Sequence, residues 1–324
     1  MITRNYKFHH IFATLIVGIL IGSLLFSKKY ATLFSKEVSW DGEGDLCQKK
    51  FILLTTERSG STWTCSLLHQ QKGVSCGGKP QKKFDLPDSE ILGQYSEKAK
   101  DGTIASVTWQ EYQKDLDDAF AEVCQYNPEV SIGFKLMYNQ IPPQFLEERK
   151  LENYLKDNGI SLIHLVREAK ILVLASKRDV KKRKKQYGGN LHHITNATLN
   201  KEIRENGYKI NWDDALIDSM LEMEALSIQW QATVHLMAPL VRYYYISYES
   251  LLAKDERDFW VGQLVGFLTE KGHDSSISNA EGTLLQLSES DCSDRIENYA
   301  GFRAHEKVKH SRSAVACDLI ATNV

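Results

Sequence analysis

The residues best suited to bind an anion form a short polar turn after a strand-like run. The apolar run Lys50–Thr56 leads into Glu57-Arg-Ser-Gly-Ser-Thr62. Backbone N–H groups of such a turn point at one spot, and the start of the next helix adds partial positive charge there. Gly60 lets the backbone approach an anion closely, and Arg58 offers a planar fork that suits phosphate or sulfate. Three more positions supply hydroxyl donors: Ser59, Ser61 and Thr62. We therefore predict a phosphate- or sulfate-binding turn.

Two other interpretations of this turn have to be weighed. The nucleoside-triphosphate loop needs a Lys directly after its last Gly, and no Lys follows Gly60, which argues against a triphosphate held with Mg²⁺. An ordinary strand-to-helix turn, with Ser61 and Thr62 as helix caps, fits the turn alone equally well. The choice depends on what the rest of the chain adds.

A second strand end of similar character lies further along the chain. The strand-like run Ile160–Val166 ends in Arg167, and the predicted helix after it carries Ser176. Taken alone, Arg167 is best explained as a surface residue paired with Glu168 or another acid. Two anion-type motifs roughly 100 residues apart, each at a strand end, make that explanation much weaker, because ligands of parallel sheets sit at the carboxyl ends of the strands.

These two motifs resemble those of one enzyme family. Thr56-Glu-Arg-Ser-Gly-Ser-Thr-Trp63 looks like the 5′-phosphosulfate loop of sulfotransferases that use 3′-phosphoadenosine 5′-phosphosulfate (PAPS), and the segment from Leu162 to Ser176 is similar to their 3′-phosphate motif. Nine residues separate Arg167 from Ser176. This gap is one longer than in cytosolic members and matches the branch of trehalose and nodulation-factor sulfotransferases.

The resemblance implies a fold, a co-substrate and a set of donor-binding residues. The fold is a three-layer α/β/α arrangement with a central parallel sheet, the co-substrate is PAPS, and no metal is needed. The residues implied to hold PAPS match the two motifs: Arg58, Ser59, Gly60, Ser61, Thr62, Trp63, Arg167 and Ser176.

Lys135 is predicted to take part in the chemistry. It lies within the apolar strand-like run Ser131–Tyr138, in a Gly-x-Lys pattern similar to that of the same branch. A Lys there is unfavourable unless it is paired or functional. We expect it to reach the sulfuryl group or the acceptor, and the alternative is a Lys that extends to solvent from an edge strand. Tyr244–Leu252 and Val265–Leu268 resemble structural segments of the family, in which Glu249 suits a helix cap better than catalysis.

The catalytic base is the part that the sequence leaves open. In the trehalose-type branch a Glu follows a Gly-x-Pro after the loop helix, but here Lys82 takes that place in Gly78-Lys-Pro-Gln-Lys-Lys-Phe84. Four residues remain as candidates, and the first two are preferred: Glu57, Asp85, His69 and Glu90. Each also suits a plain solvated position, so the acceptor is not identified.

Alternating strand-like and helix-like runs must position these residues, and they predict an α/β fold with helices on both faces of a parallel sheet. Besides the strands above, Val241–Ser247 is predicted as a strand. The predicted helices are Thr62–Gln71, Gln144–Lys156, Ala169 to about Lys185, Asp213–Leu236 and Asp255–Leu268.

The N-terminal region predicts a membrane anchor. Residues 11–26 are continuously apolar and flanked by charges. We expect a cytosolic tail (1–10), a transmembrane signal-anchor (11–26), a stem (27–45) and a lumenal domain (46–324), in a single-pass type II Golgi membrane protein. A cleaved signal peptide is the alternative, but no clear cleavage site follows the run. Asn196-Ala-Thr198 is a glycosylation acceptor that fits a lumenal domain.

The six cysteines also fit an oxidising compartment. Cys292 and Cys317 lie in one C-terminal segment and are the predicted disulfide. Cys65 is predicted as a buried helix residue and Cys124 as a core residue. The chain contains no Cys-x-x-Cys pair, which argues against a zinc site.

The overall charge limits the possible partners. A formal net charge of −2 gives no basic field for nucleic acid, so anion binding must be local. The basic run Lys181–Lys185 is explained by a solvated helix end better than by a landing site for an anionic glycan. We expect a carbohydrate or lipid-linked acceptor. A small-molecule P-loop kinase and an inactive glycan-binding module are the competing functions. The sequence does not decide whether the protein forms a homodimer.

Overall fold

The computed structural model describes residues 46–81, 86–87, 89–187, 209–270 and 292–322. The predicted tail, signal-anchor and stem lie outside these residues, as do Asp85, Lys82 and the glycosylation site at Asn196. No helix in the described part of the chain is both long and apolar enough to cross a membrane.

A five-stranded parallel sheet forms the centre of the fold, as predicted. Its strand order is β2-β5-β1-β6-β7. Phe51 to Leu54 in the middle of β1 are at most 3% exposed, because both faces of a parallel sheet are covered and the strand is apolar throughout. The strands are β1 (Lys49–Thr55), β2 (Val74–Cys76), β5 (Ser131–Met137), β6 (Ser161–Val166) and β7 (Tyr243–Ser247). The short strands β3 (Pro80–Gln81) and β4 (Leu86–Pro87) pair separately.

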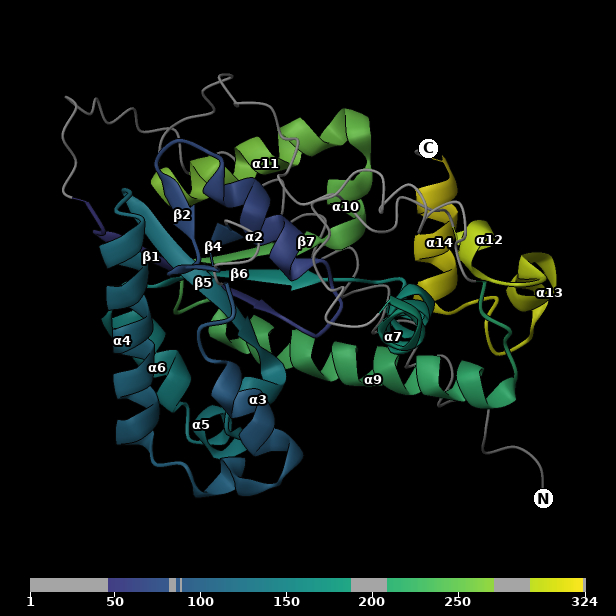
Figure 1. The fold of residues 1–324 in the computed structure, drawn as a ribbon, viewed down its shortest axis with the longest axis horizontal. Coiled ribbons are helices and arrows are strands. Elements are labelled where there is room, and N and C mark those ends of the chain that lie inside the picture. The colour runs from purple at the N-terminus through teal and green to yellow at the C-terminus, as the bar shows by residue number, and fades with distance from the viewer. Residues whose placement is uncertain (1–45, 82–85, 88, 188–208, 271–291, 323–324) are drawn as a thin grey trace, which may run out of the picture. The chain divides into compact units, whose positions relative to one another are not determined.

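Helices cover both faces of the sheet and complete the predicted three layers (Figure 1). One face packs against α2 (Ser61–His69), α10 (Tyr248–Leu252) and α11 (Lys254–Thr269). The other packs against α4 (Trp109–Tyr126), α6 (Lys150–Asp157) and α9 (Asp214–Met237). This division buries two separate apolar clusters and leaves the carboxyl edge of the sheet to the loops.

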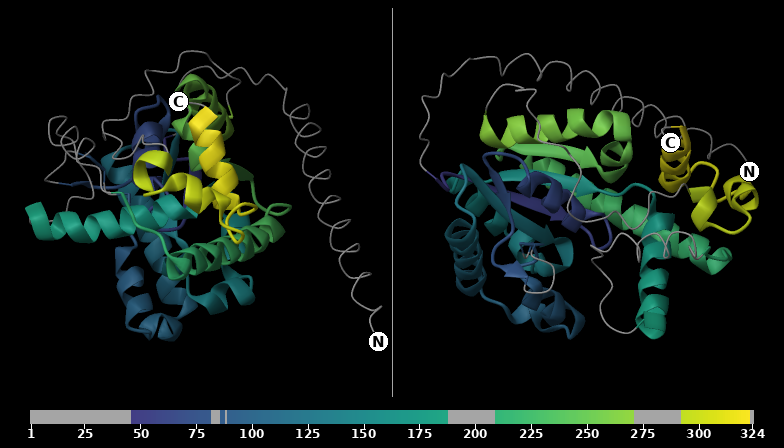
Figure 2. Two further views of the ribbon diagram at one scale, coloured as in Figure 1. Left: turned by 90° about the vertical axis from the view of Figure 1, so that its right-hand side faces the viewer. Right: turned by 45° about the horizontal axis from the view of Figure 1, so that its top comes forward.

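A third cluster joins α7 to the C-terminal helices. Buried apolar residues of α7 (Lys170–Tyr187), α9, α12 (Cys292–Arg295), α13 (Tyr299–Ala304) and α14 (Arg312–Thr322) pack together. In the two views of Figure 2 the yellow C-terminal helices stay beside one another. The helix that carries Ser176 is therefore supported by residues more than a hundred positions further along the chain. The remaining helical segments are α3 (Gly93–Lys100), α5 (Pro143–Glu147) and the 3₁₀ turns η1 (Thr103–Ser106) and η2 (Tyr138–Gln140).

The predicted helix Gln144–Lys156 is two helices, α5 and α6. The break falls at Arg149, whose φ of 56° is left-handed and cannot continue a right-handed helix. The helix α4 was not predicted, although Thr108 and Glu111 form a capping box at its start. That pair is a signal that the sequence does contain.

All six cysteines form disulfides. Cys292 bonds Cys317, as predicted. The other two bonds, Cys47–Cys124 and Cys65–Cys76, were not predicted. Cys65 is a buried residue of α2, as expected, but it reaches across to β2, a strand too short to be recognised from its pattern. Cys124 is half-buried on α4 and ties that helix to the residues before β1.

Candidate functional site

The turn after β1 is held in a fixed shape by short-range hydrogen bonds. The Ser59 hydroxyl donates to the Thr56 carbonyl (2.8 Å) and bonds the Thr55 hydroxyl. Thr55 Oγ1 in turn donates to the Leu165 carbonyl (3.0 Å) on β6. Ser59 is completely buried and therefore shapes the turn from inside. Its hydroxyl does not face outward toward a ligand.

The helix α2 begins with its N-terminus uncapped. Gly60 is the N-cap residue, and no described side chain accepts a hydrogen bond from the first turn. The prediction that Ser61 and Thr62 cap the helix is therefore wrong, because the chain turns one residue earlier, at a φ of 82° that Gly adopts without strain. An N-terminus left without a side-chain cap can offer its N–H groups to a bound anion.

A glycine is also required at position 60 because the Tyr248 ring packs against it. A Cβ at this position would lie 2.0 Å from the Tyr248 ring, the first residue of α10. Tyr248 is buried, and its ring meets the Trp63 ring edge-on at a centroid distance of 5.8 Å. The Arg257 guanidinium lies over the other ring of this pair, 5.3 Å from the Trp63 centroid. These contacts leave Trp63 only 8% exposed and pack it, with Tyr248, against the turn.

Arg58 and Ser176, the key residues of the two motifs, are in direct contact. Arg58 donates to Ser176 Oγ from Nε (3.0 Å) and from Nη2 (2.8 Å). Arg58 has a φ of 63°, which turns its side chain out of the strand direction toward α7. The structure thus brings together two segments that the sequence separates by 118 residues.

Arg167, the strand-end residue of the second motif, contacts the backbone of the first motif. Its Nη1 donates to the Arg58 carbonyl (3.2 Å), and its guanidinium lies 4.9 Å from the centre of the Tyr248 ring. Arg167 is 4% exposed, and its Nε is buried without a hydrogen-bond partner among the described residues. A buried cation with an unused donor points to a ligand that completes it.

The turn after β6 differs because a buried acid closes it. The Glu249 carboxylate accepts the N–H groups of Glu168 (3.1 Å) and Ala169 (3.0 Å), just before α7 begins. Burial raises the pKa of Glu249, and the two amides and the nearby Arg167 charge oppose that rise. The expectation that Glu249 caps a helix is confirmed.

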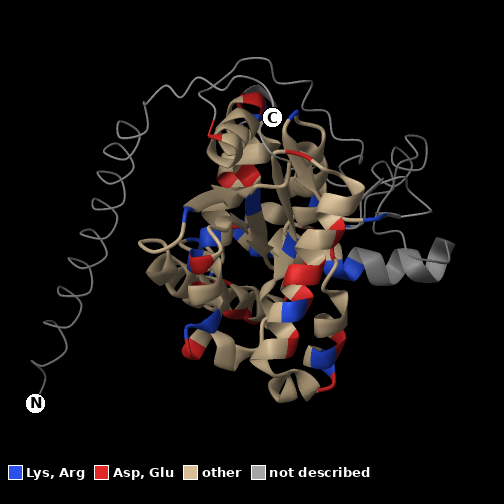
Figure 3. Ribbon diagram, turned by 90° about the vertical axis from the view of Figure 1, so that its left-hand side faces the viewer, with Lys and Arg blue, Asp and Glu red and all other residues tan. Residues whose placement is uncertain are grey.

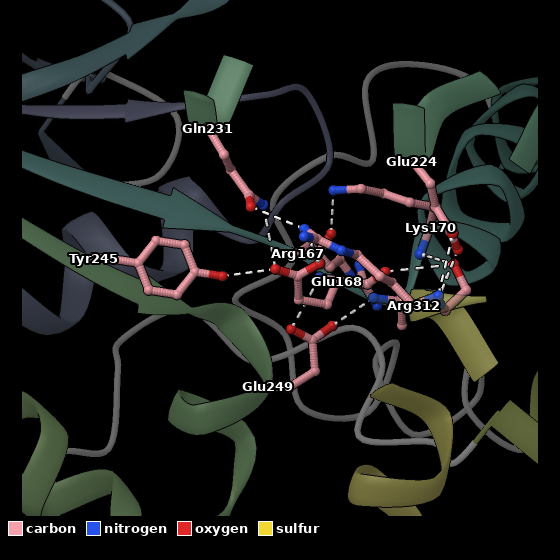
Figure 4. A network of polar contacts seen from close by, with 10 residues as sticks. Arg167, Glu168, Lys170, Glu224, Gln231, Tyr245, Glu249 and Arg312 are labelled. Carbon is pink, nitrogen blue, oxygen red and sulfur yellow. Dashed lines mark hydrogen bonds and ion pairs between the residues drawn. The ribbon is translucent and has the colours of Figure 1, made fainter. Parts of the chain in front are cut away.

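A buried network extends from this closed turn to α9 and α14 (Figure 4). Lys170 donates from Nζ to the Arg167 carbonyl and from its backbone N–H to Ser313 Oγ (2.8 Å). Burial lowers the pKa of Lys170. Glu224 accepts the N–H groups of Arg312 (3.2 Å) and Ser313 (2.8 Å), and so caps α14. The C-terminal helix is thus hydrogen-bonded to the turn that carries Arg167.

Lys135 contacts the end of the turn after β1, residues 56–62, which we call the open turn because its helix N-terminus has no side-chain cap. Its side chain is 6% exposed, and Nζ lies 3.3 Å from Thr62 Oγ1 and 3.2 Å from Glu90 Oε2. The strand β5 lies between β2 and β1, so the explanation as an edge-strand Lys is wrong. Glu90 Oε1 accepts from Gln140 Nε2 (3.3 Å), and the Glu90 side chain is 37% exposed. The buried cation therefore has a partly accessible carboxylate as its partner.

The other candidate bases are placed differently. Glu57 lies beside the turn, where it accepts from Asn139 (3.4 Å) and lies 3.8 Å from Lys177 Nζ on α7. His69 lies at the opposite end of α2, contacts Ser75 (3.3 Å), and has its pKa lowered by burial. The structure therefore brings Glu57 and Glu90 to the site and leaves His69 away from it.

Tyr248 and Gln140 are residues of the site that the sequence reasoning did not assign to it. The segment Tyr244–Leu252 marked the place of Tyr248, but its contact with Gly60 depends on the fold. The side chains of the basic run Lys181–Lys185 lie outside the described residues. On the face that Figure 3 presents, the described Lys and Arg are interspersed with Asp and Glu, so positive charge is local there. No cluster of His, Cys, Asp or Glu in the described part of the chain is placed to hold a metal ion.

Comparisons with known proteins find only distant structural similarity. No protein-family model and no curated protein matches the chain. Among solved structures, the sulfotransferase domain from the curacin biosynthetic pathway is similar at 13% identity and a TM-score of 0.37, over 85% of this chain and 92% of that one. Mouse sulfotransferase SULT7A1, complexed with PAP, is similar at 13% identity and a TM-score of 0.34, over 89% of this chain and 94% of that one. Likeness of this degree leaves the function to be argued from the residues of this chain.

Proposed function

We propose that this protein is a sulfotransferase that moves a sulfuryl group from PAPS to a hydroxyl of a carbohydrate or glycolipid. The observation that carries the proposal is the contact between Arg58 and Ser176. It joins two anion-type motifs at the carboxyl edge of a parallel sheet, where ligands of such sheets bind. A donor with phosphate groups at both the 3′ and 5′ positions needs two anion sites close together.

The open turn suits the 5′-phosphosulfate. The uncapped N-terminus of α2 offers backbone N–H groups, and Gly60 lets the turn pack directly against the Tyr248 ring. Arg58, two residues before Gly60, adds a positive charge whose guanidinium contacts Ser176 of the second motif. The negative charge that develops on the 5′-phosphate as its bond to sulfur breaks would be stabilised by these groups.

The second motif suits the 3′-phosphate. Ser176 accepts both hydrogen bonds from Arg58, which leaves its own O–H to donate to a phosphate. Arg167 donates from Nη1 to the Arg58 carbonyl and has a buried Nε with no hydrogen-bond partner among the described residues. The two motifs therefore fit the two ends of the donor, and an ADP molecule would leave the second one unused.

Lys135 is placed to contact the sulfuryl group while it is transferred. It is held beside Thr62, in the first turn of α2, and so lies next to the end of the donor that reacts. A cation there would offset the charge on the sulfuryl oxygens during in-line transfer. Arg58, Lys135 and the helix amides together would do without a metal what Mg²⁺ does in phosphoryl transfer.

Transfer of radiolabel from PAPS to a panel of glycans and lipids from the secretory pathway tests this function. We expect labelled product with PAPS and no phosphorylation of the panel from radiolabelled ATP. Label from ATP in place of PAPS would instead favour the kinase.

We also propose that the catalytic domain works in the lumen of the Golgi, anchored by residues 11–26. The three disulfides support an oxidising compartment, because such bonds are rare in reducing ones. In intact microsomes the domain should be protected from protease, and an endoglycosidase should remove a glycan at Asn196. A protease-accessible domain without a glycan would contradict this placement.

A further inference from the structure

We propose that Glu90 is the general base that takes the proton from the acceptor hydroxyl during sulfuryl transfer. This inference rests on the proposed function. It assigns the one role that the sequence left open, since Lys82 stands where the related enzymes are expected to place their Glu.

The position of Glu90 is fixed by contacts to the strand that carries Lys135. The Lys135 backbone N–H donates to the Ser89 carbonyl (2.9 Å), which joins the Glu90 segment to β5. The Glu90 carboxylate then bonds Lys135 Nζ through Oε2 and Gln140 Nε2 through Oε1. Gln140 is itself completely buried and bonds Ser96 (3.1 Å). A carboxylate held by two buried partners keeps one orientation, which a catalytic base requires.

The same contacts place Glu90 at the reacting end of the donor. Lys135 Nζ bridges Thr62, in the first turn of α2, and Glu90. A sulfuryl group beside the open turn would therefore have the leaving phosphate on the α2 side and Glu90 within reach on the other. At 37% exposure, the Glu90 side chain is still accessible to an acceptor from solvent.

Glu57 is placed less well for this role. Its carboxylate lies near Lys177 on α7, beside the residue that bonds Arg58. It also accepts from Asn139 Nδ2 (3.4 Å), but no contact among the described residues joins it to Lys135 or Thr62. Glu90 is therefore the carboxylate that is joined to the cation beside the first turn of α2.

The chemical step balances without a further reactant. The acceptor oxygen forms a bond to sulfur while the bond from sulfur to the 5′-phosphate oxygen breaks. The electron pair of the broken bond stays on the 5′-phosphate, and the acceptor proton moves to the Glu90 carboxylate. Lys135 stays charged throughout and loses its proton to neither partner.

Three variants of the full chain test this role: Glu90→Gln, Glu90→Ala and Glu90→Asp. The probes are radiolabelled PAPS with the glycan and lipid panel, with labelled sulfate released to water counted as well. Glu90→Gln should lower turnover by roughly 10²–10³, because general-base catalysis contributes about that much. Added formate should restore Glu90→Ala by about tenfold, since a small carboxylate can replace the missing base. Glu90→Asp should retain partial activity.

Two controls separate a base from a structural residue. Glu97→Ala removes another carboxylate, on α3, that forms an exposed ion pair with Lys100, and this variant should keep wild-type turnover. Adenosine 3′,5′-bisphosphate (PAP) should bind each Glu90 variant within about threefold of wild type, since the donor contacts are elsewhere. Formate rescue would not occur for a side chain that only supports the fold.

The outcomes distinguish this inference from the proposed function. A wild-type chain that binds no PAP and transfers no label would contradict the proposed function itself. Glu90→Gln turning over at near wild-type rate, or formate restoring Glu57→Ala in place of Glu90→Ala, would overturn the base assignment alone. Wild type that binds PAP but transfers label to nothing, not even water, would contradict the proposed transferase activity and the base assignment with it.

Discussion

Two turns at the same edge of the sheet lead from a buried strand into a helix, and they treat the helix N-terminus in opposite ways. After β6, the Glu249 carboxylate accepts two backbone N–H groups and is buried in doing so. After β1, Gly60 begins α2 with no side-chain cap, and Arg58 stands beside it. In the turn after β6 the protein itself supplies the acceptor for the backbone N–H groups. In the turn after β1 the N–H groups and the positive charge stay available to an anionic ligand.

The difference shows how a binding turn can be told from a structural one. Both turns have an Arg, and the two turns lie close together, because Arg167 Nη1 donates to the Arg58 carbonyl (3.2 Å). The two turns differ because, among the described residues, only the turn after β6 has a carboxylate, that of Glu249, bound to its backbone N–H groups. A carboxylate at a helix N-terminus satisfies the amides and the dipole that an anionic ligand would otherwise use.

The open turn should respond to mutation mainly in activity. Arg58→Ala removes the charge beside the proposed 5′-phosphosulfate site but leaves the backbone N–H groups in place. Transfer should fall by roughly 10²–10³ because the loss falls on the transition state. The melting temperature should change little. Arg58→Lys should rescue partly, as a point charge without the fork. Near wild-type transfer by Arg58→Ala, at unchanged melting temperature, would reduce the open turn to an ordinary one.

The closed turn should respond mainly in stability. Glu249→Ala leaves two buried N–H groups without an acceptor, and each such group costs about 1–3 kcal/mol. Part of this is offset because a buried carboxylate is itself unfavourable. Urea denaturation should show a net loss of about 2–4 kcal/mol. An unchanged free energy of unfolding would mean that the carboxylate does not cap α7.

Gly60 tests how tightly the open turn is built. Gly60→Ala combines a left-handed φ with a clash against the Tyr248 ring. Gly102→Ala is the matched control, since Gly102 has a φ of 80° and a Cβ added there would meet nothing within 4 Å. The control should lose about 1 kcal/mol. Gly60→Ala should lose clearly more and weaken PAP binding. Equal losses would show that Tyr248 moves aside without consequence.

The strand β6 should contribute a pH-dependent part of stability. His164 is completely buried between the hydroxyls of Tyr138 and Tyr243, and burial, with the Lys170 charge, lowers its pKa to about 3. The unfolded chain therefore binds this proton more readily. The stabilisation is complete above the ordinary pKa of 6.5 and is lost as pH falls toward 3. The free energy of unfolding should change with pH by up to about 1.4 kcal/mol per pH unit because of His164. In His164→Gln this contribution of one titrating proton should be missing. An equal slope in both proteins would contradict a buried neutral His164.

Local patterns were enough for much of this architecture. The apolar runs around β1, β5, β6 and β7 predicted the strands because these strands are buried on both faces. Helix spacing predicted α2, α7, α9 and α11 within a few residues. The short strand β2 was missed because three residues carry no period, and Cys65–Cys76 was missed with it. The break at Arg149 depends on one backbone angle that many residue types can adopt.

The site was predictable only where it is local. The turn residues 56–63 and the segment around Arg167 are continuous in sequence, so they could be recognised. The pairing of Lys135 with Glu90 and the contact of Gly60 with Tyr248 join distant segments, and no local pattern contains them. The capping prediction for Ser61 and Thr62 failed because Gly60, in a left-handed conformation, starts the helix first.

The most direct test of the account is the affinity of the full chain for PAP compared with ADP, measured by calorimetry. Both carry two phosphate groups, but PAP carries one at the 3′ position, which Arg167 and Ser176 are proposed to hold, whereas both phosphates of ADP are at the 5′ position. Charge-assisted hydrogen bonds contribute about 1.5–3 kcal/mol, so PAP should bind at least about tenfold more tightly. Ser176→Ala should narrow that preference and leave ADP binding unchanged. Equal affinity of the wild-type chain for PAP and ADP would contradict the assignment of the two meeting motifs to one donor.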